Sequence, residues 1–232
     1  MKYAIVISGN YRTWDQCKPS FKETFADLDF DLFVSTYNLR YDYHPYIKSR
    51  LGDASDEVIS LNKICDSLSD FNLQGISYES SQVVDEIDHN KFAPNFRTIG
   101  NPTYAQVRKL RIASDLIKKH ESAQNFKYDV VIKTRFDLQY NPIDFTKQTA
   151  NSVIFDRGNV YPNDCIYITA RDNMFNLFET MHSEFYTQQN PNSHRDPPHG
   201  LLHAAIKHHG LEERPAAIMR CVVRKGNIQQ SY

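Results

Sequence analysis

An apolar stretch that ends in charge, residues 128–140, constrains the fold of this chain more than any other segment. Its first part reads Tyr-Asp-Val-Val-Ile, which is typical of a buried β-strand, and Lys133, Arg135 and Asp137 follow. Because unpaired ions are costly inside an apolar core, we expect these three side chains to emerge at the carboxyl edge of a sheet. Ligands of open α/β sheets bind at that edge, so this stretch predicts a functional site.

The order of the remaining segments predicts the class of fold. Apolar strand-like runs and amphipathic helix-like runs alternate through the first half of the chain, which favours a parallel sheet with right-handed crossovers. Shorter and more closely spaced strands in the second half favour a mixed sheet. We therefore expect a single α/β domain, mostly parallel in its first half and mixed in its second, with helices on both faces. The expected strands cover residues 3–7, 31–36, 73–78, 128–140, 152–155, 165–169 and 217–223, and the expected helices cover residues 15–26, 56–67, 101–121, 172–186 and 199–209.

Composition narrows the class of protein. A chain of 232 residues fits one domain and is long enough to bury a core without disulfides or metal ions. A formal net charge of −1 does not favour long-range attraction to nucleic acid. The four cysteines form no C-x-x-C pair, so neither a zinc knuckle nor a dithiol redox site is indicated. No segment has the pattern of a signal peptide or a membrane span, and we expect a cytoplasmic protein.

The turn after the first expected strand is a candidate anion site, with Ser8, Gly9, Asn10 and Arg12 as its residues. Backbone N–H groups and a helix start meet there, where they can bind phosphate, and Arg12 adds charge. Neither G-x-x-x-x-G-K-[ST] nor G-x-G-x-x-G is present, so ATPase and dinucleotide-dependent dehydrogenase functions lack their main support. A purely structural turn is the alternative, because glycine after a strand is common.

The charged end of the 128–140 stretch is a candidate phosphate and metal site. It brings Asp137 to a position where a divalent cation can bridge a nucleotide diphosphate, while Lys133 and Arg135 balance the remaining negative charge. The alternative is an internal ion pair between Arg135 and Asp137. Lys109 on the longest expected helix either reaches phosphate as well or belongs to a solvated helix face.

Two acidic residues in the second half are candidates for proton transfer. Asp164 lies at the start of an expected strand, where a carboxylate can bind a sugar hydroxyl, act as a base or cap a turn. Asp196 lies in a histidine-rich segment, where it or His199 could act as a base or metal ligand. A zinc site is not predicted, because His199 and His203 are four residues apart without the H-E-x-x-H pattern. No G-x-S-x-G elbow is present, so a nucleophilic hydrolase has no support.

Together these segments resemble a known family, the small GT-A-type glycosyltransferases of large DNA viruses and of bacterial surface-polysaccharide clusters. The order of the matching pieces along the chain carries the resemblance, because each piece is short. Residues 40–100 match no part of the family. The matching pieces are residues 4–13, 31–36, 128–137, 162–164 and 199–202.

The resemblance implies a nucleotide-sugar donor. In this family a D-x-D signature at the end of the strand after the long helix holds Mn²⁺ or Mg²⁺ against the diphosphate. Here Arg135 stands at the first Asp position and Asp137 at the second, an R-x-D form that related sequences often share. The resemblance further implies that the base of the donor lies near residues 8–12, Thr36 and Tyr37.

The resemblance also implies the reaction, which is metal-assisted transfer of a sugar from a nucleoside diphosphate to a hydroxyl of a glycan. Residues 1–140 would bind the donor and residues 141–232 the acceptor, in the host cytoplasm if the chain is viral. Asp164 or Asp196 would deprotonate the acceptor if the reaction inverts the anomeric centre. The family usually begins its closing helix with Pro-Glu, whereas this chain has Pro-His at residues 198–199.

Two other functions stay open. A sugar nucleotidyltransferase normally carries a glycine-rich, lysine-bearing loop after its first strand, where Gly9 stands alone here. A non-catalytic glycan-binding module is favoured by the aromatic residues 37–46 and would explain the missing first Asp of the signature.

Overall fold

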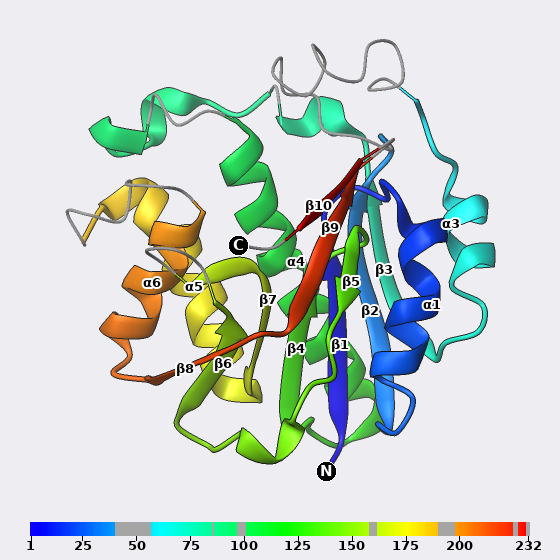
Figure 1. The fold of residues 1–232 in the computed structure, drawn as a ribbon. Coiled ribbons are helices and arrows are strands. Elements are labelled where there is room, and N and C mark those ends of the chain that lie inside the picture. Colours follow the sequence, from blue (N-terminus) through cyan, green and yellow to red (C-terminus); the bar gives the residue numbers. More distant parts are fainter. Residues whose placement is uncertain are drawn as a thin grey trace.

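A seven-stranded sheet forms the centre of the computed structural model, which describes residues 1–39, 57–84, 86–96, 101–157, 162–189, 198–224 and 227–230. Its strands are β1 (Tyr3–Ser8), β2 (Phe30–Tyr37), β3 (Leu73–Glu79), β4 (Val130–Thr134), β6 (Ser152–Asp156), β7 (Asn163–Ala170) and β8 (Glu212–Ala216). They lie in the order β3-β2-β1-β4-β7-β6-β8 (Figure 1). A second sheet has the order β10-β9-β5 and consists of β5 (Leu138–Tyr140), β9 (Met219–Arg224) and β10 (Asn227–Gln230).

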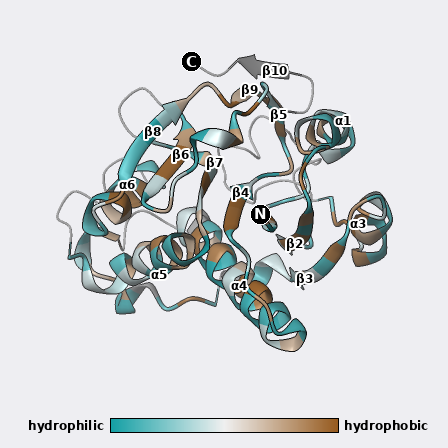
Figure 2. Cartoon of the chain, turned by 90° about the horizontal axis from the view of Figure 1, so that it is seen from below, coloured by the Kyte–Doolittle hydropathy of each residue, from teal (hydrophilic) through white to brown (hydrophobic). Residues whose placement is uncertain are grey.

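Helices lie on both faces of the main sheet, as expected. Their bounds are α1 (Trp14–Thr24), α3 (Leu61–Ser67), α4 (Asn101–Gln124), α5 (Arg171–Thr187) and α6 (His199–His208). Residues of α4, α5 and α6 pack with Ala4, Val6 and Phe33 in one core, and residues of α1, α3 and β5 pack with Ile5 and Ile7 in the other. Figure 2 shows α4 and α5 on one side of the strands and α1 on the opposite side. Short 3₁₀ helices occur at Ser81–Val84, His89–Lys91, Pro94–Phe96 and Phe145–Lys147.

The first half of the sheet is parallel. β1 pairs in parallel with both β2 and β4, and β2 pairs in parallel with β3. The chain therefore runs outward from β1 through β2 to β3, and the 24-residue helix α4 then carries it back to β4 on the other side of β1. The direction of strand order thus reverses between β1 and β4.

The second half of the sheet is mixed. β7 is antiparallel to β4, β6 is antiparallel to β7, and β8 is parallel to β6. This arrangement confirms the expected α/β class with a parallel first half and a mixed second half. Among the helices that the structure describes, none has the length and apolar character needed to cross a membrane.

Two expectations about individual elements are wrong, and strands β8 and β10 are absent from the expectations. The stretch 128–140 is not one strand, because β4 ends at Thr134 and the chain turns before it enters β5 of the second sheet. The helix expected over 56–67 begins only at Leu61, because the Ser60 side chain accepts a hydrogen bond from the backbone N–H of Lys63 and caps it there. Strand β8 is absent from the expectations, since its sequence, Glu-Glu-Arg-Pro-Ala, has the charge and proline of an edge strand.

Candidate functional site

The reversal of strand order between β1 and β4 defines where a ligand is expected to bind. In open α/β sheets, ligands occupy the crevice outside the carboxyl ends of the strands at such a topological switch point. The chain leaves β1 at Ser8 and leaves β4 at Thr134. The turn after Ser8 and the turn after Thr134 therefore meet at the position that favours ligand binding.

The turn after β1 has a fixed and unusual backbone. Gly9 adopts a φ of 109°, which a side chain would disfavour, and its N–H donates to the Ser35 carbonyl at 3.1 Å. Arg12 is also left-handed, with a φ of 47°, which is costly for a residue other than glycine. Thr13 anchors the turn to β9, because its hydroxyl donates to the Val223 carbonyl at 2.6 Å. These contacts fix the direction in which the Arg12 side chain leaves the backbone.

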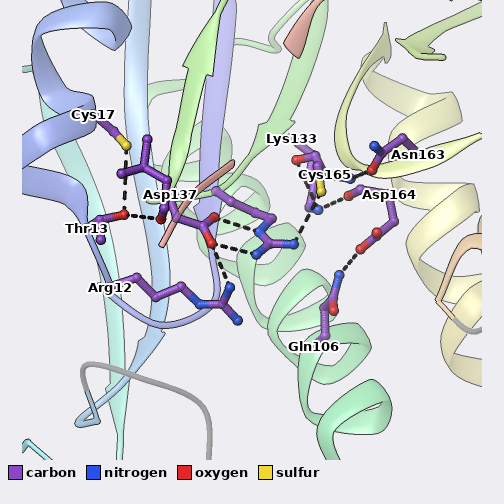
Figure 3. A network of polar contacts seen from close by, with 11 residues as sticks. Arg12, Thr13, Cys17, Gln106, Lys133, Asp137, Asn163, Asp164 and Cys165 are labelled. Carbon is purple, nitrogen blue, oxygen red and sulfur yellow. Dashed lines mark hydrogen bonds and ion pairs between the residues drawn. The ribbon is translucent and has the colours of Figure 1, made fainter. Parts of the chain in front are cut away.

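Asp137 accepts hydrogen bonds from two arginines: Arg12, which Figure 3 labels, and Arg135. The carboxylate is completely buried, and its Oδ2 accepts from Arg12 Nη1 at 2.6 Å. Arg135 binds both oxygens, with Nε 2.9 Å from Oδ1 and Nη2 2.7 Å from Oδ2. The internal ion pair between Arg135 and Asp137, which the sequence left open, is therefore formed, and Arg12 joins it from a distant part of the chain.

The second turn is also tied into its surroundings. The Val223 N–H of β9 donates to the Asp137 carbonyl at 2.8 Å, and Arg135 Nη1 donates to Cys165 Sγ at 3.3 Å. Burial is the largest single influence and disfavours the Arg135 charge, but Asp137, Cys165 and Asp164 together outweigh it and raise the pKa of Arg135 well above its ordinary value. Arg135 therefore stays charged under all ordinary conditions.

Lys133 lies beneath this turn and does not emerge from the sheet, contrary to expectation. Its side chain is fully buried on β4, opposite Tyr167 in the pairing with β7. The ammonium donates to the backbone carbonyl oxygens of Asp164 and, at 3.4 Å, of Cys165, and it lies 5.3 Å from the centroid of the Tyr167 ring. These groups replace water around the charge, although burial still lowers the pKa of Lys133.

Asp164 and His199 form a second cluster beside Lys133. Gln106 of α4 donates its side-chain amide to Asp164 Oδ2, and Asp164 Oδ1 lies 3.0 Å from His199 Nδ1. The backbone N–H of Asp164 donates to the same nitrogen at 3.1 Å, which requires the tautomer whose Nδ1 carries no proton. Burial opposes the Asp164 charge, but Lys133, His199 and Arg135 hold the pKa of that carboxyl below its ordinary value. The His199 side chain is 31% exposed against 5% for Asp164, so His199 is the member of the pair that solvent reaches.

At the carboxyl end of β2, Lys109 of α4 contacts both Thr36 and Tyr37. Lys109 is fully buried, so it is not part of a solvated helix face. Its ammonium donates to the Thr36 carbonyl at 2.8 Å and to Glu79 Oε2 at 2.6 Å, and it lies 3.9 Å from the Tyr37 ring centroid. Burial lowers the pKa of Lys109 to about 8. Glu79 also accepts two hydrogen bonds from Arg108, so these groups hold α4 against the ends of β2 and β3.

The remaining sequence candidates divide into two groups. Ser8 is buried at the end of β1, and Asn10 is buried in the turn that follows. The hydroxyls of Ser8 and of Ser35, its pairing partner on β2, have no hydrogen-bond partner among the described residues. Buried hydroxyls of this kind are normally satisfied by water or a ligand. Asp196 lies outside the described residues.

The residues at Asp137 do not fit a resident metal site in this arrangement. Both carboxylate oxygens already accept hydrogen bonds from guanidinium groups. Within the part of the chain that the structure describes, no group of three or more His, Cys, Asp or Glu side chains could hold a metal ion.

Gln106 is a site residue that sequence reasoning missed. It lies one turn before Lys109 on α4, so the two side chains project from neighbouring positions of one helix face. The helical spacing of Gln106 and Lys109 could have indicated that Gln106 also reaches the edge of the sheet. Its partner Asp164 is 58 residues away in sequence, and no local pattern indicates that contact.

No protein-family model matches the chain, and no curated protein matches its sequence.

Proposed function

We propose that the chain transfers a sugar from a nucleoside diphosphate sugar to a hydroxyl group of a glycan. The observation that carries the proposal is the meeting of Arg12 and Arg135 at the switch point between β1 and β4, with Lys133 beneath them. A ligand at this position is favoured by the topology of the sheet, and an anionic ligand is favoured by the arginines. The resemblance of the sequence to GT-A-type glycosyltransferases selects a nucleotide sugar from among such anions.

The donor half of the proposal concerns residues 1–140. The diphosphate would lie against Arg12 and Arg135, and the nucleoside would lie toward residues 8–10 and the end of β2 at Thr36 and Tyr37. The bond between the anomeric carbon and the diphosphate oxygen breaks with its electron pair remaining on the diphosphate. Fixed positive groups stabilise this developing charge without reorganising, which is the most effective form of electrostatic catalysis.

The acceptor half concerns residues 141–232. As the acceptor oxygen bonds to the anomeric carbon, its proton must pass to a base if the reaction inverts that centre. We assign this role to His199, because its ring is accessible and Asp164 is not. Asp164 acts through His199 in the tautomer that carries its proton on Nδ1. That nitrogen then donates to Asp164 Oδ1 at 3.0 Å instead of accepting from the Asp164 N–H, so Nε2 can take the acceptor's proton and the carboxylate stabilises the imidazolium that forms. A cytoplasmic location, expected from the sequence, stays a prediction.

The proposal is tested by measuring Tm of the protein in the presence of each member of a panel of UDP, dTDP and GDP sugars. A donor at about 100 times its Kd adds about 2.7 kcal/mol to the free energy of unfolding. For a chain of this size that raises Tm by roughly 5 to 10 °C. We expect one nucleotide sugar of the panel to raise Tm by this amount. We also expect the protein to hydrolyse that donor slowly.

The variant Arg12→Gln should lose the shift. The matched control is Arg111→Gln, since Arg111 is 50% exposed on α4 and its contact with Glu179 is 3.9 Å long. Stabilisation by free glycans, with no response to any nucleotide, would replace the proposal with the glycan-binding module. Formation of a nucleotide sugar from a sugar phosphate would replace it with the nucleotidyltransferase.

A further inference from the structure

We infer that the diphosphate of the donor is bound directly by the guanidinium groups of Arg12 and Arg135, without a bridging divalent metal, and that Asp137 is a positioning residue for both arginines. This inference rests on the proposed function and extends it to the cofactor requirement. It departs from the metal role that the sequence assigns to Asp137.

The contacts of Asp137 are those of an arginine-orienting carboxylate. Three hydrogen bonds of 2.6 to 2.9 Å join its two oxygens to Arg12 and Arg135. The carboxylate is completely buried, and its own backbone carbonyl accepts from Val223. A divalent cation bound to these oxygens would either compete with the guanidinium N–H groups or lie directly beside them, which would place three cations around one carboxylate.

The charge of the cluster already suits a diphosphate. In the contacts between these five side chains, three cations (Arg12, Arg135 and Lys133) meet two carboxylates (Asp137 and Asp164). A divalent cation would normally supply such a charge next to a diphosphate. Here the side chains supply it.

The geometry of Arg135 leaves it able to bind phosphate as well as Asp137. A guanidinium has five N–H donors in one plane. Arg135 uses Nε and Nη2 for Asp137, and Nη1 contacts a thiol sulfur, which is a weak acceptor. Further N–H groups on Nη1 and Nη2 therefore stay available, and such planar forks are suited to phosphate oxygens.

Calorimetric titration with UDP, GDP and dTDP, in excess EDTA and again in Mn²⁺, tests this inference. We expect the same nucleotide to bind under both conditions with a similar Kd. The variants Arg135→Gln and Arg12→Gln should each weaken binding by about 10- to 100-fold, since each loses a charge-assisted hydrogen bond. Arg135→Lys should recover only part of the affinity, because it restores the charge without the fork.

Asp137→Asn separates a positioning role from a metal-binding role. A positioning residue predicts weaker binding of the nucleotide to the same degree in EDTA and in Mn²⁺, whereas a metal ligand predicts loss of a response to Mn²⁺ that the unaltered protein shows. Arg111→Gln should bind as the unaltered protein does. Binding that needs Mn²⁺ would overturn the inference and leave the proposed function standing. Absence of binding under both conditions would overturn the proposed function itself.

Discussion

The substitution Asp137→Asn should destabilise the fold strongly. The side chain is completely buried, while those of Arg12 and Arg135 are 12% and 16% exposed, so the amide would leave two guanidinium groups facing each other without their counter-charge. Removing one partner of a buried ion pair costs about 3 to 5 kcal/mol. That is a large part of the roughly 5 to 15 kcal/mol that stabilises a typical domain.

Urea unfolding provides the assay. With a denaturant slope of about 3 kcal/mol per molar, the midpoint should fall by about 1 M or more. Asp70→Asn is the matched control, because Asp70 also contacts two cations, Lys18 at 2.8 Å and Lys22 at 3.1 Å, but its side chain is 43% exposed. Solvent screens such contacts, so the midpoint of this control should hardly change. Equal midpoints for the two variants would refute the view that Asp137 neutralises buried arginines.

Three further outcomes follow from other parts of the structure. Hydrogen bonds from Arg108 outweigh burial and lower the pKa of Glu79 to about 2 from 4.5, so Glu79 contributes stability above pH 4.5 that is lost as the pH falls toward 2. In Glu79→Gln, the urea unfolding midpoint should therefore fall less between pH 4.5 and pH 2 than it does in the unaltered protein. An equal fall in both proteins would contradict the role of Glu79 in this pH dependence. A thiol reagent should label the folded protein at Cys65, because the other three cysteines are buried, and Cys65→Ser should abolish that labelling before unfolding. His199→Gln should lower kcat with little change in donor affinity, and an unaffected kcat would remove His199 from the reaction.

The central strands could be predicted from the sequence because they are buried on both faces. β1, β2 and β4 are fully or almost fully buried, so each is a continuous apolar run. β8 lies at the edge of the sheet and is only partly covered, so its pattern does not separate it from a loop. The wrong helix start before Leu61 has a local cause, since the apolar spacing continues past the Ser60 cap.

The sequence predicts where the candidate site lies more readily than it predicts which residues contact each other there. Charge at the end of an apolar strand indicated the edge where Arg135 and Asp137 lie. The bond from Arg12 to Asp137 spans 125 residues, and only the parallel pairing of β1 with β4 brings the two turns together. The burial of Lys133 could not be predicted either, because the carbonyl groups and the ring that stabilise its ammonium all come from β7.

A crystal structure of the protein with the bound nucleoside diphosphate, grown in EDTA, tests the central claim most directly. The account predicts phosphate oxygens within hydrogen-bond distance of Arg12 and Arg135, outside the carboxyl ends of β1 and β4, with Asp137 still bound to both arginines. A diphosphate bound elsewhere on the molecule would contradict the account.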